Sequence, residues 1–256
     1  MKLNILYEDT HLLVCYKPAG VPVQSADVGR EDCVSILKNY LYEKQPGKEP
    51  YLGVVHRLDQ PVEGALVFAK TPFAAKELSR QVTDGTMQKY YLALCKLSAA
   101  DCGKCGKLVH SVDNVEKPVE NPQIYEDYLL KNGKTNTSEI VSERTPGAKK
   151  ARLEFWELGR KDGQKLVKIK LITGRHHQIR VQMAHHGSPL AGDTKYNPQS
   201  VENSNVDKSL AAGRGVALCA YRLELIHPKS GKLLQFEICP EHGLLKEAYE
   251  EFGKNS

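Results

Sequence analysis

The sequence lacks any apolar run that approaches the roughly 20 residues needed by a membrane-spanning helix. Its N-terminal segment, Met1 to Asp9, also lacks the pattern of a secretory signal peptide. These two absences predict a cytoplasmic protein with no membrane partner. With 256 residues, of which 41% are hydrophobic and 26% charged, the chain can bury a core and has the composition of an ordinary globular protein.

The seven cysteines form no disulfide framework or zinc-site pattern. Cys102 and Cys105 form a single Cys-x-x-Cys pair, which supplies two of the four ligands of a structural zinc site, and no second pair exists. We therefore predict no metal site and interpret the pair as the tip of an irregular insertion over residues 96–126. A metal or redox role is the alternative. Four other cysteines lie in apolar segments and are expected to be buried: Cys15, Cys95, Cys219 and Cys239.

The net charge of +5 is unevenly distributed along the chain. Residues 144–185 hold eleven Lys or Arg against three acidic residues, or +8, whereas the remainder holds 25 basic against 28 acidic residues, or −3. A segment that carries all the positive excess is typical of proteins that bind a phosphate backbone. The alternative is an ordinary solvated surface.

Apolar runs predict strands at residues 3–7, 11–16, 65–69, 89–95, 149–158, 164–172, 216–225 and 232–239. Helical spacing and cap residues predict helices at 31–43, from Thr71-Pro72 to Gly85, before Gly187, and at 244–252. Strands follow one another in hairpins more than they alternate with helices. This order predicts an α+β fold with a mixed, largely antiparallel sheet and flanking helices. No break in composition appears, so we predict one domain over residues 1–256.

The stretch His56-Arg57-Leu58-Asp59 places three chargeable side chains between the apolar runs 53–55 and 65–69. Because those runs predict strands, the tetrad is expected to be a loop held by the core. A carboxylate beside a core is desolvated unless a cation pairs with it, which makes Asp59 the first catalytic candidate. The alternative is an Asp in a tight turn, which Pro61 favours.

Three other stretches accompany the tetrad: Lys17-Pro18-Ala19-Gly20, Lys89-Tyr90-Tyr91-Leu92-Ala93, and Thr173-Gly174-Arg175-His176-His177-Gln178-Ile179-Arg180 followed by Gly187, Pro189, Gly192, Asp193 and Tyr196. In this order, and with Gly64 and Ala69-Lys70-Thr71 after the tetrad, they resemble the RluA-type RNA pseudouridine synthase family from about residue 5 to 240. The chain departs from many members at Val62-Glu63, where Thr-Ser or Thr-x is common, and at Gln182, where His is common.

The resemblance implies a pseudouridine synthase fold with an active-site cleft across the sheet, and isomerisation of uridine within RNA without a cofactor. Asp59 would be the catalytic carboxylate, either attacking the anomeric carbon or removing the neighbouring 2′ proton. Tyr91 would stack on the uracil near carbon 5, with a core aromatic as the alternative. Arg180, or less favourably Arg175, would keep Asp59 ionised; both could instead bind phosphate.

The resemblance also implies that Arg57 helps to extrude the uridine, by stacking in its place or clamping a phosphate. His56 and Leu58 are expected to support the loop, with substrate contact by His56 as the alternative. The predicted substrate-binding set comprises Arg57, His56, Leu58, Arg175, His177, Gln178 and Lys17. The histidines at 176, 177, 185 and 186 lack the spacing of a zinc-binding helix, so we predict no metal ligands among them.

The predicted partner is RNA, either ribosomal or transfer RNA, and the predicted assembly is a monomer. Many relatives carry a small RNA-binding domain ahead of the catalytic one, and here we expect the catalytic domain to bind RNA by itself. One alternative is a non-catalytic RNA-binding or ribosome-assembly factor on the same scaffold, which would tolerate loss of Asp59. A carboxylate-dependent glycosidase is another, with Glu63 as the nearest second carboxylate.

Overall fold

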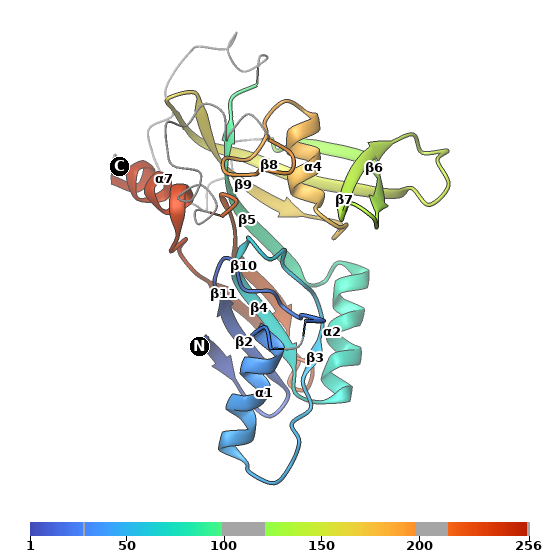
Figure 1. The fold of residues 1–256 in the computed structure, drawn as a ribbon, viewed down its shortest axis with the longest axis vertical. Helices are drawn as coiled ribbons and strands as arrows, with labels where there is room; N and C mark the ends of the chain where they lie inside the picture. Colours follow the sequence, from blue (N-terminus) through green and yellow to red (C-terminus); the bar gives the residue numbers. More distant parts are fainter. Residues whose placement is uncertain (28, 99–120, 198–214, 255–256) are drawn as a thin grey trace. The chain divides into compact units, whose positions relative to one another are not determined.

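The computed structural model of this chain describes residues 1–27, 29–98, 121–197 and 215–254 (Figure 1). The chain divides into two compact units. Unit 1 comprises Met1–Lys89 and Ala220–Cys239, and unit 2 comprises Tyr90–Cys219 and Pro240–Ser256. Each unit combines helices with antiparallel strand pairs, which confirms the predicted α+β class.

Unit 1 is built on strands β1 (Asn4–Glu8), β2 (Leu12–Lys17), β4 (Glu63–Ala69) and β10 (Leu218–Ile226), in that order across the sheet. β3 (Gly53–Val54) pairs with β4, and β11 (Leu233–Glu237) pairs with β10. The antiparallel β2–β4 ladder places Lys17 opposite Gly64. The end of β2 therefore lies beside the start of β4, where the tetrad loop enters the sheet.

The two helices of unit 1 begin within two residues of their predicted starts. α1 (Cys33–Lys44) is capped by Asp32, whose side chain accepts a hydrogen bond from the Ser35 amide at 2.7 Å. α2 (Pro72–Asp84) is capped by Thr71 and ends at Gly85, whose φ of 78° lies in the left-handed region that glycine favours. One face of α2 packs on the core cluster of the sheet, which includes Leu12, Val14, Ala65, Val67, Ala74, Leu78 and Leu225.

Unit 2 is built on strands β5 (Gln88–Lys96), β9 (Gln164–Leu171), β8 (Lys149–Lys161), β6 (Gln123–Asn132) and β7 (Thr137–Val141), in that order. Its helices are α4 (Gln178–His185) and α7 (Gly243–Lys254). The ladders align Tyr91 with Ile169, and Ile169 with Phe155. Ala151 shares a sheet face with Phe155 and packs against Val181 of α4. Tyr91 thus points to the face of this sheet that α4 covers.

The β6–β7 hairpin is the main element that the sequence pattern does not predict. Residues 96–126 were expected to be an irregular insertion or an extended hairpin, and no element was expected at 127–143. In the structure β6 begins at Gln123 and pairs with β8. The reason is its composition, because Leu129 is the single residue of β6 that is fully buried. Most of its residues stay in contact with solvent on both faces of the strand. The sequence therefore shows little of the apolar alternation that indicates a strand. Cys102 and Cys105 lie outside the described residues.

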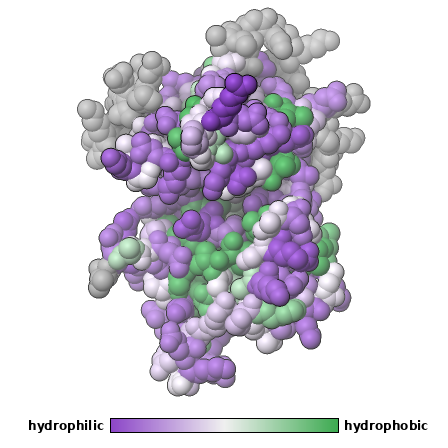
Figure 2. Space-filling view, turned by 90° about the vertical axis from the view of Figure 1, so that its right-hand side faces the viewer, coloured by the Kyte–Doolittle hydropathy of each residue, from purple (hydrophilic) through white to green (hydrophobic). Residues whose placement is uncertain are grey.

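Hydrophilic residues cover most of the face displayed in Figure 2, with hydrophobic residues gathered in smaller groups. Single large hydrophobic side chains reach the surface at several positions, including Tyr42, Tyr51 and Phe73 in unit 1 and Ile124 and Ile172 in unit 2. Scattered residues of this kind are normal for a globular surface. No helix within the described ranges is long and apolar enough to cross a membrane.

Candidate active site

The tetrad lies in the loop between β3 and β4 of unit 1. Leu58 is buried, Asp59 is partly buried and Arg57 is exposed, so the leucine anchors the loop while the arginine faces solvent. The Asp59 carbonyl accepts a hydrogen bond from the Val62 amide at 3.0 Å, which closes a turn over Pro61. The structure thus contains the tight turn that Pro61 favours, and the catalytic role of Asp59 stays a prediction.

His56 supports this loop from within unit 1. Its Nε2 accepts a hydrogen bond from the Val67 amide at 3.3 Å, which requires that nitrogen to be unprotonated. Burial, and to a smaller extent the charge of Lys89, lowers the pKa of His56 to about 3. The ring is therefore neutral at physiological pH and is placed to hold β4, in line with the expected supporting role.

Lys17 is fully buried at the end of β2. Its Nζ donates to the carbonyls of Pro18 at 3.0 Å, Val21 at 2.7 Å and Gln60 at 3.1 Å. The Gln60 carbonyl also accepts from the Gly20 amide at 2.8 Å. These bonds fasten the Lys-Pro-Ala-Gly loop to the Asp59 turn. The sequence predicted substrate binding for Lys17, whereas its contacts favour a supporting role.

The start of β4 is closely packed. Gly64 has a φ of 146°, and a Cβ atom there would lie 2.5 Å from the Cβ of Ala220, so no other residue fits without movement. Glu63 beside it is 3% exposed and accepts a hydrogen bond from the Tyr16 hydroxyl. Glu63, at which this chain departs from many family members, is therefore buried and hydrogen-bonded.

In unit 2, Tyr91 and Arg180 are both buried. Arg180 forms a bidentate ion pair with Asp193, with Nε 2.7 Å from Oδ2 and Nη2 2.8 Å from Oδ1. The Asp193 side chain is also buried, and its Oδ1 accepts from the amides of Lys195 at 3.0 Å and Tyr196 at 3.2 Å. Such a pair fixes the plane of the guanidinium.

Asp193 is a positioning residue that was not among the predicted site residues. It stood within the third motif, directly after Gly192, and that proximity was the available signal. Gly192 has a φ of 72°, and a Cβ there would lie 2.3 Å from the Gly215 carbonyl oxygen. The chain thus turns sharply at this point and directs the carboxylate at Arg180.

The residues ahead of Arg180 hold the start of α4 to β8. Gln178 is buried; its Oε1 accepts from the Thr173 hydroxyl at 2.8 Å and the Arg175 amide at 3.0 Å, and its Nε2 donates to the Arg152 carbonyl at 3.1 Å. His177 adopts a left-handed φ of 54° and lies 2.9 Å from the Tyr196 hydroxyl through Nδ1. Gln178 and His177 therefore shape the loop, whereas Arg175 is exposed.

Gln182, where many family members have His, is completely buried in α4. Its Nε2 donates to Asp127 Oδ2 at 2.6 Å, and His186 Nε2 lies 3.1 Å from the same oxygen. His186 also stacks on Tyr125, with ring centroids 3.9 Å apart. This cluster ties α4 to β6. Across the residues that the structure describes, no group of three or more His, Cys, Asp or Glu could hold a metal ion.

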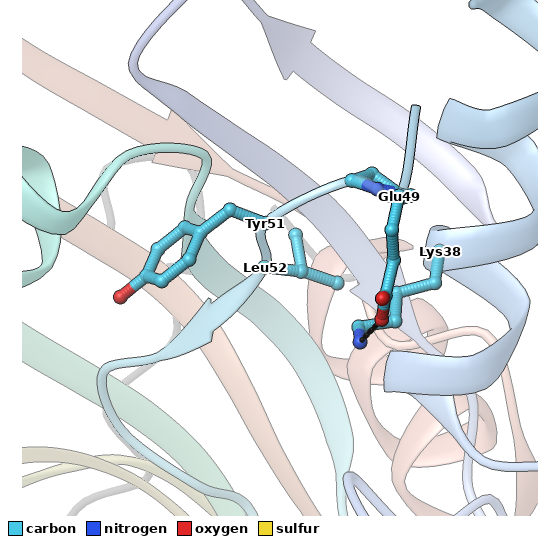
Figure 3. Close-up of a pocket in the computed structure, with 5 residues that line it drawn as sticks. Lys38, Glu49, Tyr51 and Leu52 are labelled. Atoms are coloured by element: carbon cyan, nitrogen blue, oxygen red, sulfur yellow. Dashed lines mark hydrogen bonds and ion pairs between the residues drawn. The ribbon is translucent and has the colours of Figure 1, made fainter. Parts of the chain in front are cut away.

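A surface hollow of about 390 Å³ lies elsewhere on unit 1, beside α1 (Figure 3). It is lined by Lys38, Glu49, Pro50, Tyr51 and Leu52. Lys38 and Glu49 face each other at 3.2 Å as a mostly exposed ion pair. None of the candidate site residues lines this hollow, so it does not compete with the tetrad loop as the reactive site.

The candidate catalytic residues lie in different units, Asp59 in unit 1 and Tyr91 and Arg180 in unit 2. Unit 1 presents a carboxylate in a fastened turn beside an exposed arginine. Unit 2 presents a buried guanidinium fixed by a carboxylate, and a buried tyrosine on the same sheet face as the helix that carries the guanidinium.

Comparisons with known proteins find relatives that match most of this chain. A family model described as RNA pseudouridylate synthase matches residues 11–185. The ribosomal large subunit pseudouridine synthase D of Nitrosomonas europaea is 35% identical over 237 residues, and the alignment covers 92% of this chain but 61% of that relative. The ribosomal large subunit pseudouridine synthase C of Escherichia coli K12 is 30% identical over 240 residues, covering 94% of this chain and 67% of that one.

The chain thus spans less than two thirds of the length of the Nitrosomonas relative. Among solved structures, the human RNA pseudouridylate synthase domain containing 4 superposes with a TM-score of 0.69 at 20% identity, over 98% of this chain and 93% of that one. At that level of identity the likeness establishes the fold.

Proposed function

The chain belongs to the RNA pseudouridylate synthase family, and we propose that it isomerises uridine within RNA to pseudouridine. The observation that carries the proposal is the family tetrad with Asp59 in a turn fastened by buried contacts. In the proposed reaction the bond between the anomeric carbon and N1 of uracil breaks, the base turns, and a bond from the same carbon to C5 forms. The proton of C5 leaves and N1 gains one, so no net oxidation or reduction takes place.

Asp59 is the catalytic carboxylate in this proposal, by attack on the anomeric carbon or by removal of the 2′ proton. Tyr91 stacks on the freed uracil and accepts or relays the C5 proton. Arg180, with Arg175 as second choice, provides the cation that favours an ionised Asp59. The bidentate Asp193 pair supports the choice of Arg180, because it fixes two nitrogen atoms of the guanidinium. The motif pattern supports the assignment of all three roles.

The proposed substrate is ribosomal RNA, with transfer RNA as the alternative. Relatives named as ribosomal large subunit pseudouridine synthases support the first choice. The basic segment 144–185 supplies phosphate contacts, and Arg57, exposed on the same loop as Asp59, aids extrusion of the uridine. We also propose a cytoplasmic monomer, since a ribosomal substrate is met there and the motifs fall on one chain.

Conversion of Asp59 to Asn tests the proposal. Because Asn keeps the size of the side chain but removes its charge, we expect folding and RNA affinity within about twofold of wild type and pseudouridine formation lowered by at least about 10³-fold. Pseudouridines would be mapped across ribosomal RNA incubated with the wild-type chain and with Asp59→Asn. Turnover near the wild-type rate in the variant would reject Asp59 as the catalytic group. A wild-type chain that binds RNA without forming pseudouridine would favour the non-catalytic factor.

A further inference from the structure

The number of carbonyl oxygens around Lys17 Nζ equals the number of N–H donors of its charged form. Three carbonyl oxygens, from Pro18, Val21 and Gln60, lie within 3.1 Å of Nζ. An ammonium group has three N–H donors, whereas the neutral amine has two and a lone pair. Loss of the proton therefore removes the Lys17 donor from one of the three carbonyls and turns a lone pair toward its oxygen. Of the three bonds, the one to Gln60 is the longest, and it is the one that reaches the residue next to Asp59.

We propose that Lys17 is a positioning residue whose ammonium form holds the Asp59 turn in its working geometry, so that its deprotonation sets the upper pH limit of activity. This inference rests on the proposed function, because it acts through Asp59. It differs from the predicted role of Lys17 in substrate binding, which its complete burial does not favour.

The surroundings of Lys17 place its titration in an accessible range. Lys17 lies near the Cys33 thiol, the Asp59 carboxylate, the Cys15 thiol and the Glu63 carboxylate. These groups come from α1, the tetrad loop, β2 and β4. Burial lowers the pKa of Lys17 to about 8, and the negative charges of the two carboxylates limit the fall. Burial raises the pKa of both thiols, that of Cys33 to about 11. Lys17 therefore loses its proton before either cysteine does.

The effect on stability has the opposite sign to the effect on activity. The pKa of Lys17 in the folded chain, about 8, lies below the ordinary value of 10.5. The folded state thus holds fewer protons at this site than the unfolded state between these pH values, and stability rises with pH through this group. A fall in activity above pH 8 without a fall in melting temperature distinguishes the loosened turn from unfolding.

The first test is the pH profile of pseudouridine formation from pH 6.5 to 10, with kcat and KM for one ribosomal RNA fragment. In the wild-type chain we expect kcat to fall with a midpoint near pH 8 while KM changes little. Lys17→Met keeps the side-chain length without a charge; we expect kcat about 10- to 100-fold lower at pH 7, unchanged RNA affinity, and no titration near pH 8.

Lys70→Met is the matched control. Lys70 also holds an oxygen-lined site in unit 1, with Nζ 2.7 Å from Glu8 Oε1 and 2.6 Å from the Asp9 carbonyl, but it makes no contact with the tetrad turn in any of its described bonds. We expect a lower melting temperature and an unchanged alkaline midpoint. An alkaline midpoint that persists in Lys17→Met, or that moves in Lys70→Met, overturns the proposal.

A second variant and a direct titration guard against a Lys17→Met chain that does not fold. Glu63→Gln keeps an acceptor for Tyr16 but removes a charge that favours the ammonium of Lys17, so the midpoint moves to lower pH. NMR of ¹³Cε-labelled lysine follows Lys17 itself, and a midpoint above about 10 overturns the proposal. Because this measurement needs no turnover, an inactive wild-type chain rejects the proposed function separately from the titration of Lys17.

Discussion

Asp59 in unit 1 and Arg180 in unit 2 are held by opposite means. The turn of Asp59 is fastened by a buried cation, Lys17, through backbone carbonyls, whereas the guanidinium of Arg180 is fastened by a buried carboxylate, Asp193, through side-chain atoms. The lysine can lose its proton near pH 8, and an arginine keeps its charge throughout the range in which proteins are studied. We therefore expect alkaline pH to weaken the support of Asp59, because Lys17 loses its proton, and to leave the support of Arg180 intact.

The largest expected effect comes from breaking the support of Arg180. Asp193→Asn leaves a buried guanidinium without its counter-charge, which should lower the free energy of unfolding by about 3–5 kcal/mol. Urea denaturation at pH 7 measures the change. Activity should fall too in whatever fraction stays folded, because the guanidinium is no longer fixed.

The matched control for Asp193 is Glu49→Gln, which breaks the mostly exposed pair with Lys38 (Figure 3). An exposed pair of this kind contributes about 0–1 kcal/mol, so its loss should be near the error of the measurement. If Asp193→Asn cost no more than Glu49→Gln, the Arg180 pair would not be the rigid support that distinguishes unit 2 from unit 1.

The sequence predicted these supports unevenly. Helix α2 was predicted at both ends because Thr71, Pro72 and Gly85 act on their own neighbours, and local signals of this kind are visible in a sequence. Asp193 was not assigned, because its partner is thirteen positions away and nothing in its neighbours shows which charge it meets. Hairpin β6–β7 was missed because few residues of its strands are buried and they show no clear apolar alternation.

The roles of the lysines show the same limit. The Lys-Pro-Ala-Gly stretch was recognised as a shaped loop, but a sequence does not show whether an ammonium group points outward to phosphate or inward to carbonyls. The structure places Lys17 inward, where three oxygens surround it. Tyr91, Arg180 and Asp59 remain predictions as a catalytic set, supported by pattern and by their separate surroundings.

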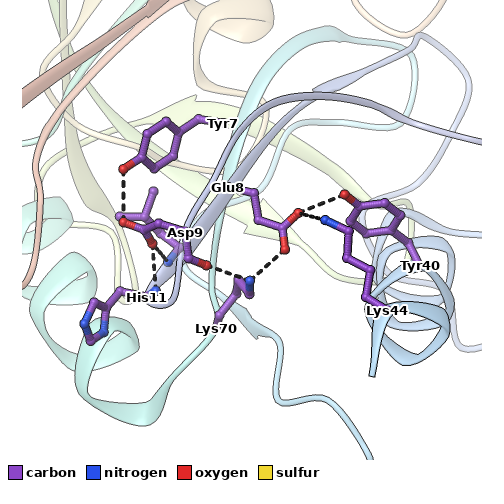
Figure 4. Close-up of polar contacts among 8 residues, drawn as sticks. Tyr7, Glu8, Asp9, His11, Tyr40, Lys44 and Lys70 are labelled. Atoms are coloured by element: carbon purple, nitrogen blue, oxygen red, sulfur yellow. Dashed lines mark hydrogen bonds and ion pairs between the residues drawn. The ribbon is translucent and has the colours of Figure 1, made fainter. Parts of the chain in front are cut away.

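A smaller effect on stability is expected from Glu8, whose contacts are shown in Figure 4. It extends the comparison to low pH. Burial alone would raise the pKa of Glu8, but hydrogen bonds from Lys44, Lys70 and Tyr40 outweigh it and lower the pKa to about 2. Because this value lies below the ordinary 4.5, the stabilisation is complete above about pH 4.5 and is lost as pH falls toward 2.

We expect Glu8→Gln to cost about 2 kcal/mol at pH 7, since Lys44 is half exposed and part of the interaction is screened. At pH 2.5, close to the pKa of Glu8 in the folded chain, only a small part of this cost should remain. Thermal denaturation of both chains across this pH range gives the difference. A cost that is equal at both pH values would show that the contribution of Glu8 is packing and not charge. Ionisation of Glu8 would then set no acid limit to the stability of unit 1. The contrast with the alkaline limit that Lys17 sets to activity would no longer hold.

The smallest effect on stability is expected at Arg57, the exposed counterpart in unit 1 of the buried Arg180. Since its side chain faces solvent, Arg57→Ala should change the free energy of unfolding by less than about 0.5 kcal/mol. If Arg57 aids extrusion of the uridine, activity should fall about tenfold more on a base-paired RNA than on a single-stranded one, because the second needs little unstacking. Arg57→Lys keeps the charge but cannot stack, so it should behave like Arg57→Ala if stacking matters and like wild type if a phosphate clamp does. Equal losses on both RNAs would assign Arg57 to general phosphate binding, and the tetrad loop would then carry a single specialised residue, Asp59.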